Sequence, residues 1–424
     1  MRDGSPCHEN CQWSTLLFPQ RVTEALNRGG GMADLIYLDA AASTPIAPEA
    51  FETTMQVMLE TGNAGSAHLA GHTAAARVDR ARVLVAELMS VGPAGVVFVG
   101  SATEANNLAL RGLVRQPDRS DVVVTSTDHP SVLATVDDIV SEHGRSHRVR
   151  VNNTGEVDLD NLQAVLGPGT AIVSVHAANN ETGVIQPLEE IAAQAHQAGA
   201  LVHADASQLM AWGPSPILDH CDLVTVSSHK MHGPQGAAAL IIRPTARERL
   251  KSQMTGGGQE RGLRSGTVNV AAVSGFGTAA ELSLSSGAES AKQVKALRAR
   301  LMDGLKSSFD DVIEHGADAR RRAPGILNTA FGMNRGPAIE SELLLARLPR
   351  LAASTGSACH AGVPGPSPVL LEMGVSTLEA ARSIRMSLNR YTTIGDVDAA
   401  LGELRRGYTE LFHLLGGSEL EERY

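Results

Sequence analysis

Short apolar runs alternate with longer stretches of helical character from about residue 35 onward. Runs typical of buried strands occupy residues 35–38, 96–99, 122–126, 171–176, 201–204, 223–227 and 238–242. Helices cover both faces of a parallel sheet, so its strands read as continuous apolar runs and not as alternating ones. The pattern therefore predicts an α/β fold with a mostly parallel sheet wrapped by helices.

The pattern changes beyond residue 285. We expect a helix over 291–305, strands at 326–331, 351–353 and 384–388, and a terminal helix from about residue 396. At roughly 150 residues per domain, a chain of 424 residues predicts two or three domains. The sequence favours a large α/β domain over 32–285 and a smaller α+β domain over 286–424. Residues 32–50 of the large domain could pack on the smaller one.

The first 31 residues show neither helical nor strand periodicity and end in three glycines, so we expect a disordered extension. Whether Met32 is the true start stays open. Cys7 and Cys11, with His8 between them, resemble half of a zinc site. Because no second ligand pair follows downstream, we expect no metal site.

Composition narrows the function classes. A formal net charge of −10 and a pI near 5.8 argue against direct nucleic-acid binding, which needs a clustered basic face. No apolar run is long enough for a membrane span and no signal pattern opens the chain, so we expect a cytoplasmic protein. Four cysteines (Cys7, Cys11, Cys221 and Cys359) are too few for a disulfide framework in a chain of this length. At least one is expected to work as a thiol, whereas Cys221 is expected to be a small core residue.

Polar residues just after the strands are candidates for binding, because ligands of such sheets lie beyond the carboxyl ends of the strands. The segment from Gly100 to Asn107 follows a strand and opens a helix. It is typical of a phosphate site, although an ordinary helix cap has the same pattern. His129 follows the next strand, where it could cap a helix, lie at the surface or stack on a ligand.

Asp205 and Lys230 carry the more specific chemistry. An aspartate at the end of a buried strand is costly unless a cation pairs with it, and a protonated pyridine nitrogen would serve. Lys230 ends another strand within SSHKMHGP, beside two histidines. A desolvated lysine near other cationic groups has a lowered pKa and can form a Schiff base, whereas an isolated loop lysine is usually a surface residue.

Residues from about 36 to 405 resemble the cysteine desulfurases, which are pyridoxal-phosphate (PLP) enzymes of fold type I in the class-V aminotransferase superfamily, and the related selenocysteine lyases. The resemblance rests on YLDAAASTP, GNAGSAH, GSATEANNLAL, ANNETGVIQP, VHADASQ, SSHKMHGPQG, GGGQERGLRSGT, TGSACHAG and SIRMSLNRYTT, which occur in the family's order.

The resemblance implies a role for each matching residue. Lys230 would bind the cofactor covalently, Asp205 would pair with the ring nitrogen, and His129 would stack on the ring and assist catalysis. Asn180 and Gln208 would bind the oxygen side of the ring, and Asn180 and Arg385 would hold the substrate, with Arg385 clamping its carboxylate. The phosphate-binding set would be Ala102, Thr103, Ser227, His229 and Thr267. In this family the threonine reaches across from a second subunit, so a homodimer is implied.

Cys359 matches the family's nucleophilic cysteine, which takes sulfur from L-cysteine as a persulfide and passes it to a sulfur-acceptor protein. His360 stands where serine or threonine is frequent, and PSPVLLEMGV resembles selenocysteine lyases as much as desulfurases. A selenocysteine lyase, an aminotransferase that does not need Cys359, and a sulfur-relay scaffold without turnover therefore stay as alternatives. The sulfur acceptor stays open between iron–sulfur assembly, tRNA thiolation and DNA sulfur modification.

Overall fold

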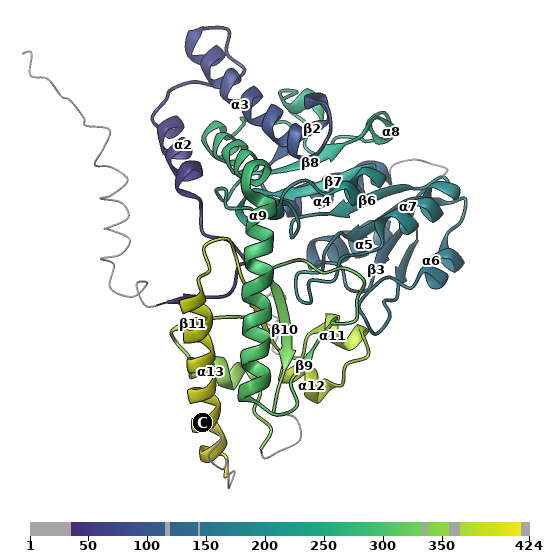
Figure 1. The fold of residues 1–424 in the computed structure, drawn as a ribbon. Coiled ribbons are helices and arrows are strands. Elements are labelled where there is room, and N and C mark those ends of the chain that lie inside the picture. The colour runs from purple at the N-terminus through teal and green to yellow at the C-terminus, as the bar shows by residue number, and fades with distance from the viewer. Residues whose placement is uncertain (1–34, 115–118, 143–144, 333–336, 356–364, 417–424) are drawn as a thin grey trace, which may run out of the picture. The chain divides into compact units, whose positions relative to one another are not determined.

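A seven-stranded sheet forms the centre of the N-terminal part of the molecule (Figure 1). The computed structural model describes residues 35–114, 119–142, 145–332, 337–355 and 365–416. In spatial order the strands are β2 (Val96–Val99), β8 (Ala238–Ile242), β7 (Leu223–Ser227), β6 (Leu201–Asp205), β5 (Thr170–His176), β3 (Asp121–Thr125) and β4 (Ser146–Val149). β8 runs antiparallel to both of its neighbours, β2 and β7, and the other neighbouring pairs of this sheet are parallel. The prediction of an α/β fold with a mostly parallel sheet is confirmed.

Helices cover both faces of this sheet, and successive residues of one strand pack on opposite faces. Val122 and Val124 join one apolar cluster, and Val123 joins the other. One face is covered by α4 (Ala102–Leu113), α5 (Pro130–Glu142) and α8 (Pro244–Arg247), and the other by α3 (Leu69–Leu88), α6 (Leu159–Val165), α7 (Leu188–Gln197) and the first half of α9 (Val270–Ser308). The double burial explains why these strands read as continuous apolar runs.

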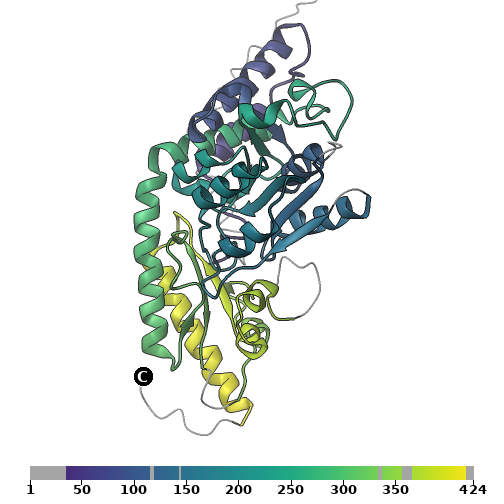
Figure 2. The same cartoon turned by 90° about the vertical axis from the view of Figure 1, so that its right-hand side faces the viewer.

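A three-stranded antiparallel sheet forms the centre of the C-terminal part. Its strand order is β12 (Ile384–Ser387), β10 (Ile326–Ala330) and β9 (Ile313–Glu314). Around it lie α10 (Ser341–Ala346), α11 (Pro368–Glu372), α12 (Thr377–Ala381) and α13 (Ile394–Leu414), which packs beside α9 (Figure 2). A short parallel pair joins β1 (Ile36–Tyr37) to β11 (Leu351–Ala352), and α2 (Pro48–Met58) follows β1 in the chain.

The predicted domain boundary after residue 285 falls inside α9, which is 39 residues long. The helix runs from the seven-stranded sheet to the C-terminal elements, so the division into 32–285 and 286–424 stays a prediction (Figure 1). Ile36 and Leu38 pack in the apolar cluster of the C-terminal part. The predicted N-terminal extension, with Cys7 and Cys11, lies outside the described residues. None of the described helices is both long and apolar enough to cross a membrane.

Candidate active site

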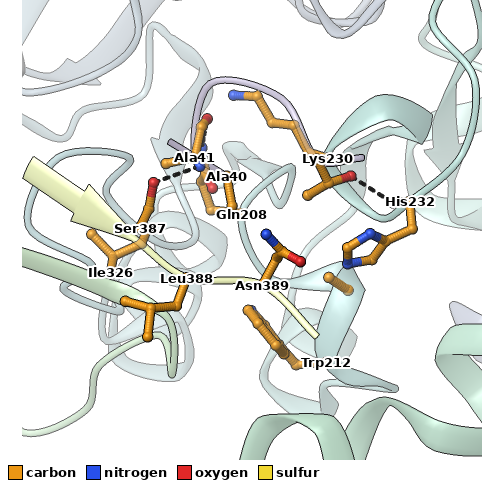
Figure 3. Close-up of a pocket in the computed structure, with 12 residues that line it drawn as sticks. Ala40, Ala41, Gln208, Trp212, Lys230, His232, Ile326, Ser387, Leu388 and Asn389 are labelled. Atoms are coloured by element: carbon orange, nitrogen blue, oxygen red, sulfur yellow. Dashed lines mark hydrogen bonds between the residues drawn. The ribbon is translucent and has the colours of Figure 1, made fainter. Parts of the chain in front are cut away.

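Lys230 lies at the end of a short 3₁₀ helix, Ser228–Lys230, that follows β7 directly. The turn after it needs special backbone geometry. His232 has a φ of 67°, and a Cβ added at Gly233 would lie 2.1 Å from the Ser228 Oγ. The Lys230 side chain lines a pocket with Gln208, Trp212 and Asn389 (Figure 3). The sequence motif thus forms a tight turn that presents the lysine to a pocket.

Asp205 ends β6, one strand away from the strand that leads to Lys230. Its carboxylate accepts hydrogen bonds from Asn106 Nδ2 at 2.9 Å and from the Ser207 backbone N–H at 3.0 Å. Burial alone raises the pKa of this carboxyl, but the two hydrogen bonds and the positive charge of Lys230 outweigh it and hold the pKa below its usual value. Asp205 is therefore an anion at neutral pH and can pair with a cationic group.

His129 is held by a hydrogen-bond chain that starts at Asp205. Asn106 Nδ2 also donates to the Ser131 Oγ at 2.9 Å, and that oxygen lies 2.8 Å from His129 Nδ1. The backbone N–H of Ser131 donates to the same ring nitrogen at 3.0 Å. Because Nδ1 is the acceptor, we assign the proton of the neutral imidazole to Nε2. The sequence analysis did not identify Asn106 or Ser131.

The residues predicted to bind phosphate lie on neighbouring elements. Ala102 and Thr103 open α4, which packs against β7, and the helix is capped by Ser101, whose Oγ accepts from the Glu104 N–H at 3.1 Å. Free N–H groups at such a helix start favour an anion. Ser227 ends β7, and its Oγ is buried without a hydrogen-bond partner among the described residues. These are the groups that a phosphate would satisfy.

The other two predicted phosphate residues have different surroundings. His229 Nδ1 lies 3.2 Å from Ser43 Oγ, and burial followed by the nearby Lys230 charge lowers its pKa to about 4. His229 is therefore neutral at physiological pH. Thr267 is exposed, and the stretch before it is tied to α4 by an ion pair between Arg264 and Glu104 at 2.7 Å. Its contact with a second subunit stays a prediction.

Arg385 is completely buried on β12. Its Nη2 donates to Asp39 Oδ1 at 2.7 Å, and its Nη1 donates to the Asn180 carbonyl at 3.1 Å. The structure thus joins two predicted substrate residues, Asn180 and Arg385, and adds Asp39, which the sequence analysis did not identify. Gln208 Nε2 donates to the Ala41 carbonyl at 2.9 Å, close to the same N-terminal segment.

A second carboxyl lies near Arg385. Glu181 follows Asn180 in the ANNETG motif, is 1% exposed and accepts a hydrogen bond from the Ser367 hydroxyl. Burial raises the pKa of this carboxyl to about 7, against the lowering effects of Ser367 and of Arg385. Glu181 therefore titrates near neutrality, a property that the sequence pattern did not predict.

Cys359 and His360 lie outside the described residues. Cys221 is described and is 1% exposed, as the sequence analysis expected. Burial, together with the charge of Asp222, raises the pKa of its thiol to about 12. Because the thiolate is the reactive form, Cys221 is an inert thiol.

Comparison with known proteins identifies the family. A family model of class-V aminotransferases matches residues 36–400. The chain is 40% identical to a cysteine desulfurase IscS of an Anaeromyxobacter species, over 86% of this chain and 90% of that protein. The chain belongs to the class-V aminotransferases and, among them, to the cysteine desulfurase family.

Solved structures agree with this assignment. A NifS-like protein superposes with a TM-score of 0.80 at 29% identity, covering 89% of this chain and all of the other. A structure described as SspA in complex with cysteine superposes with a TM-score of 0.73 at 28% identity, covering 84% and 99% of the two chains. Class-V aminotransferases and cysteine desulfurases depend on PLP, and the predicted fold type is confirmed.

Proposed function

We propose that this chain is a cysteine desulfurase that binds PLP through Lys230 and moves the sulfur of L-cysteine to Cys359. The reaction is L-cysteine plus the Cys359 thiol giving L-alanine plus a Cys359 persulfide, so all atoms are retained. The observation that carries the proposal is the anionic Asp205 opposite Lys230, on adjacent strand ends of a chain that belongs to this family.

The described residues fit the cofactor. Asp205 would hold the protonated ring nitrogen, and PLP bound in this way withdraws electrons from the substrate. The Ser227 Oγ, which has no hydrogen-bond partner within the described part of the chain, and the N–H groups at Ala102 and Thr103 would hold the phosphate, with neutral His229 and Thr267. Gln208 and Asn180 would lie on the oxygen side of the ring.

The hydrogen bonds around His129 suggest how the proton transfers are divided. Its Nδ1 accepts from Ser131, so its Nε2 carries the proton that the stacked imidazole would offer when it assists catalysis. The amine of Lys230, once released from the cofactor, would be the base that takes the Cα proton of the substrate. Arg385 would bind the substrate carboxylate, for which its planar fork is suited.

The partners follow from the same proposal. L-cysteine is the substrate, a sulfur-acceptor protein receives the persulfide sulfur, and the exposed Thr267 supports a homodimer in which it completes the partner's phosphate site. The strongly negative net charge supports the absence of direct nucleic-acid binding. A cytoplasmic location stays a prediction.

A single-turnover experiment tests the function. The PLP-loaded protein is incubated with L-cysteine, and alanine, sulfide and the mass of the peptide with Cys359 are measured. We expect one alanine per active site and a mass increase of one sulfur atom on Cys359. Cys359→Ala should keep the visible absorbance of the lysine-bound cofactor and lose the sulfur product, whereas Lys230→Ala should lose that absorbance. Cys221→Ala is the matched control and should behave as the unmodified protein.

The alternatives give other results. A selenocysteine lyase would turn over L-selenocysteine and leave L-cysteine unchanged. An aminotransferase would need a keto-acid acceptor and would keep its activity in Cys359→Ala. A sulfur-relay scaffold would form no alanine at all.

A further inference from the structure

Arg385 is anchored at both terminal nitrogens of its guanidinium by groups of the chain itself. Nη2 contacts Asp39 at 2.7 Å and Nη1 contacts the Asn180 carbonyl at 3.1 Å. A guanidinium carries five N–H groups, and these contacts use two of them. Within the described residues, hydrogens of the guanidinium therefore remain for a substrate carboxylate while the side chain is held in place.

Asp39 provides the only charge in direct ion-pair contact with Arg385 among the described residues. The arginine side chain is 1% exposed and the aspartate side chain is 24% exposed. A buried arginine without a counter-charge is costly, so the pair stabilises the guanidinium in this orientation. Because Asp39 is partly exposed, it lies at the boundary between the buried arginine and solvent.

The backbone that follows Asp39 is fixed to two elements that carry the site. We call residues 39–47 the strap. On one side the strap bonds to β12, since the Ala41 N–H donates to Ser387 Oγ at 2.8 Å (Figure 3). On the other side it bonds to the turn around Lys230, residues 228–233, which we call the lysine turn. The Thr44 N–H donates to the His229 carbonyl at 2.9 Å, and Thr44 Oγ1 accepts from the His232 N–H at 2.8 Å.

We propose that Asp39 is a positioning residue for substrate binding, which holds the Arg385 fork at a fixed place relative to the Lys230 turn. Asp39 acts through Arg385 and does not contact the reacting atoms. The inference rests on the proposed function, in which Arg385 binds the carboxylate of L-cysteine. The strap that carries Asp39 is bonded both to β12 and to the lysine turn. Asp39 therefore sets the distance between the Lys230 amine and the Arg385 guanidinium, and the amino-acid substrate must fit this distance.

The test is steady-state kinetics of PLP-loaded Asp39→Asn with L-cysteine. Asparagine keeps the shape of the side chain and removes its charge. We expect KM to rise at least tenfold while kcat stays within about threefold and the cofactor absorbance is unchanged, because loss of a charge-assisted hydrogen bond loosens Arg385. Asp398→Asn, which breaks an exposed ion pair with Arg300, is the control and should leave KM unchanged.

A carboxylate-free probe separates positioning from a general structural role. L-cysteinamide lacks the group that Arg385 would bind, so its apparent Kd, read from the cofactor absorbance, should be the same in Asp39→Asn and in the unmodified enzyme. A parallel loss for L-cysteine and L-cysteinamide would overturn the inference. So would an unchanged KM for L-cysteine.

Asp39→Glu keeps the inference testable if Asp39→Asn does not fold. This variant moves the charge by one methylene, and a raised KM with an unchanged kcat supports the inference, whereas an unchanged KM overturns it. If the unmodified holoenzyme makes no alanine from L-cysteine, the proposed function fails and this inference fails with it. If the unmodified enzyme is active and the Asp39 variants have the same KM as it does, the proposed function stands and this inference fails.

Discussion

Asn106 Nδ2 lies 2.9 Å from both Asp205 Oδ2 and Ser131 Oγ, so one amide group links the acid of the site to its histidine. The two hydrogens of the amide are both used. One helps to keep Asp205 ionised, and the other orients the hydroxyl that donates to His129. Asn106 is itself completely buried on α4, so this geometry is fixed by the fold.

Asn106→Ala is therefore expected to weaken cofactor binding. A hydrogen bond to a charged group contributes about 1.5–3 kcal/mol, so we expect an increase of about 10- to 100-fold in the Kd for PLP. The Kd is measured by titrating the apoprotein with PLP and following the absorbance. Asn107→Ala, one residue along the same helix, is the control and should change the Kd less than threefold. Equal affinities of the two variants would show that the amide of Asn106 is dispensable.

The strands were predictable from sequence because they are buried on both faces. The observed bounds of β2, β7 and β8 equal the predicted runs. The direction of β8 was not predictable, since an apolar run has the same composition in either direction. The start of α9 was also missed. Its first half contains Gly275 and Gly277, which lower helix propensity, and a Cβ at Gly277 would lie 2.6 Å from Ala81 Cα. The small residues allow close packing against α3.

The site was predictable only in part, for a related reason. Lys230 and Asp205 could be proposed as site residues because their chemistry is unusual at the end of a buried strand. Asn106 and Asp39 carry no such local signal, because their roles depend on partners 99 and 346 residues away. Both lie inside the motifs that indicated the family, but only the three-dimensional contacts show what they bind.

Glu181 predicts a pH-dependent stability. Its folded pKa of about 7 lies above the ordinary value of 4.5. Its contribution is therefore fully present below pH 4.5 and is lost as the pH rises to about 7, because ionisation then favours the unfolded state. The shift corresponds to a loss on the order of 3 kcal/mol. Buried histidines such as His229 titrate over the same range in both proteins, so the difference between the two is the quantity to measure. In denaturant unfolding, the free energy of unfolding of the unmodified protein should fall by this amount relative to that of Glu181→Gln as the pH rises from 4.5 to about 7.

Glu190→Gln is the matched control for this measurement. Glu190 has an exposed side chain paired with Arg320, and its pKa is lowered, so its titration lies below the range in question. Its variant should show the same pH dependence of the free energy of unfolding as the unmodified protein. A Glu181→Gln protein with that same pH dependence would show that Glu181 does not titrate in this range.

Cys221 should resist alkylation in the folded protein. Its buried thiol, with a pKa of about 12, presents almost no thiolate at about pH 8. We expect brief treatment with iodoacetamide to leave the Cys221 peptide unmodified and to modify it fully after unfolding, as read by peptide mass. Modification of Cys221 in the native protein as fast as in the unfolded chain would contradict its inert assignment.

The ion pair between Arg82 and Glu260 should be essential for stability. Both residues are under 10% exposed, and the Glu260 carboxylate accepts from Arg82 at 2.7 and 2.8 Å and from the Phe98 N–H at 2.8 Å. These bonds hold Glu260 at a φ of 47°, in a region that L-residues seldom adopt. Glu260→Ala leaves the buried Arg82 charge with only the exposed carboxylate of Asp79, 3.9 Å from its Nε, and loss of the buried partner costs about 3–5 kcal/mol.

Glu281→Ala is the control. It removes the ion pair of Glu281 with Arg80, which is also an arginine–glutamate pair, and Arg80 lies on the same helix as Arg82. That pair has a distance of 3.0 Å but exposed side chains, 65% and 53%, and such pairs contribute at most about 1 kcal/mol. Urea unfolding at one protein concentration compares the two variants. Similar losses would mean that solvent reaches the Glu260 site. A loss confined to Glu260→Ala would show that the buried bonds from α3 and β2 to the Glu260 carboxylate stabilise the fold.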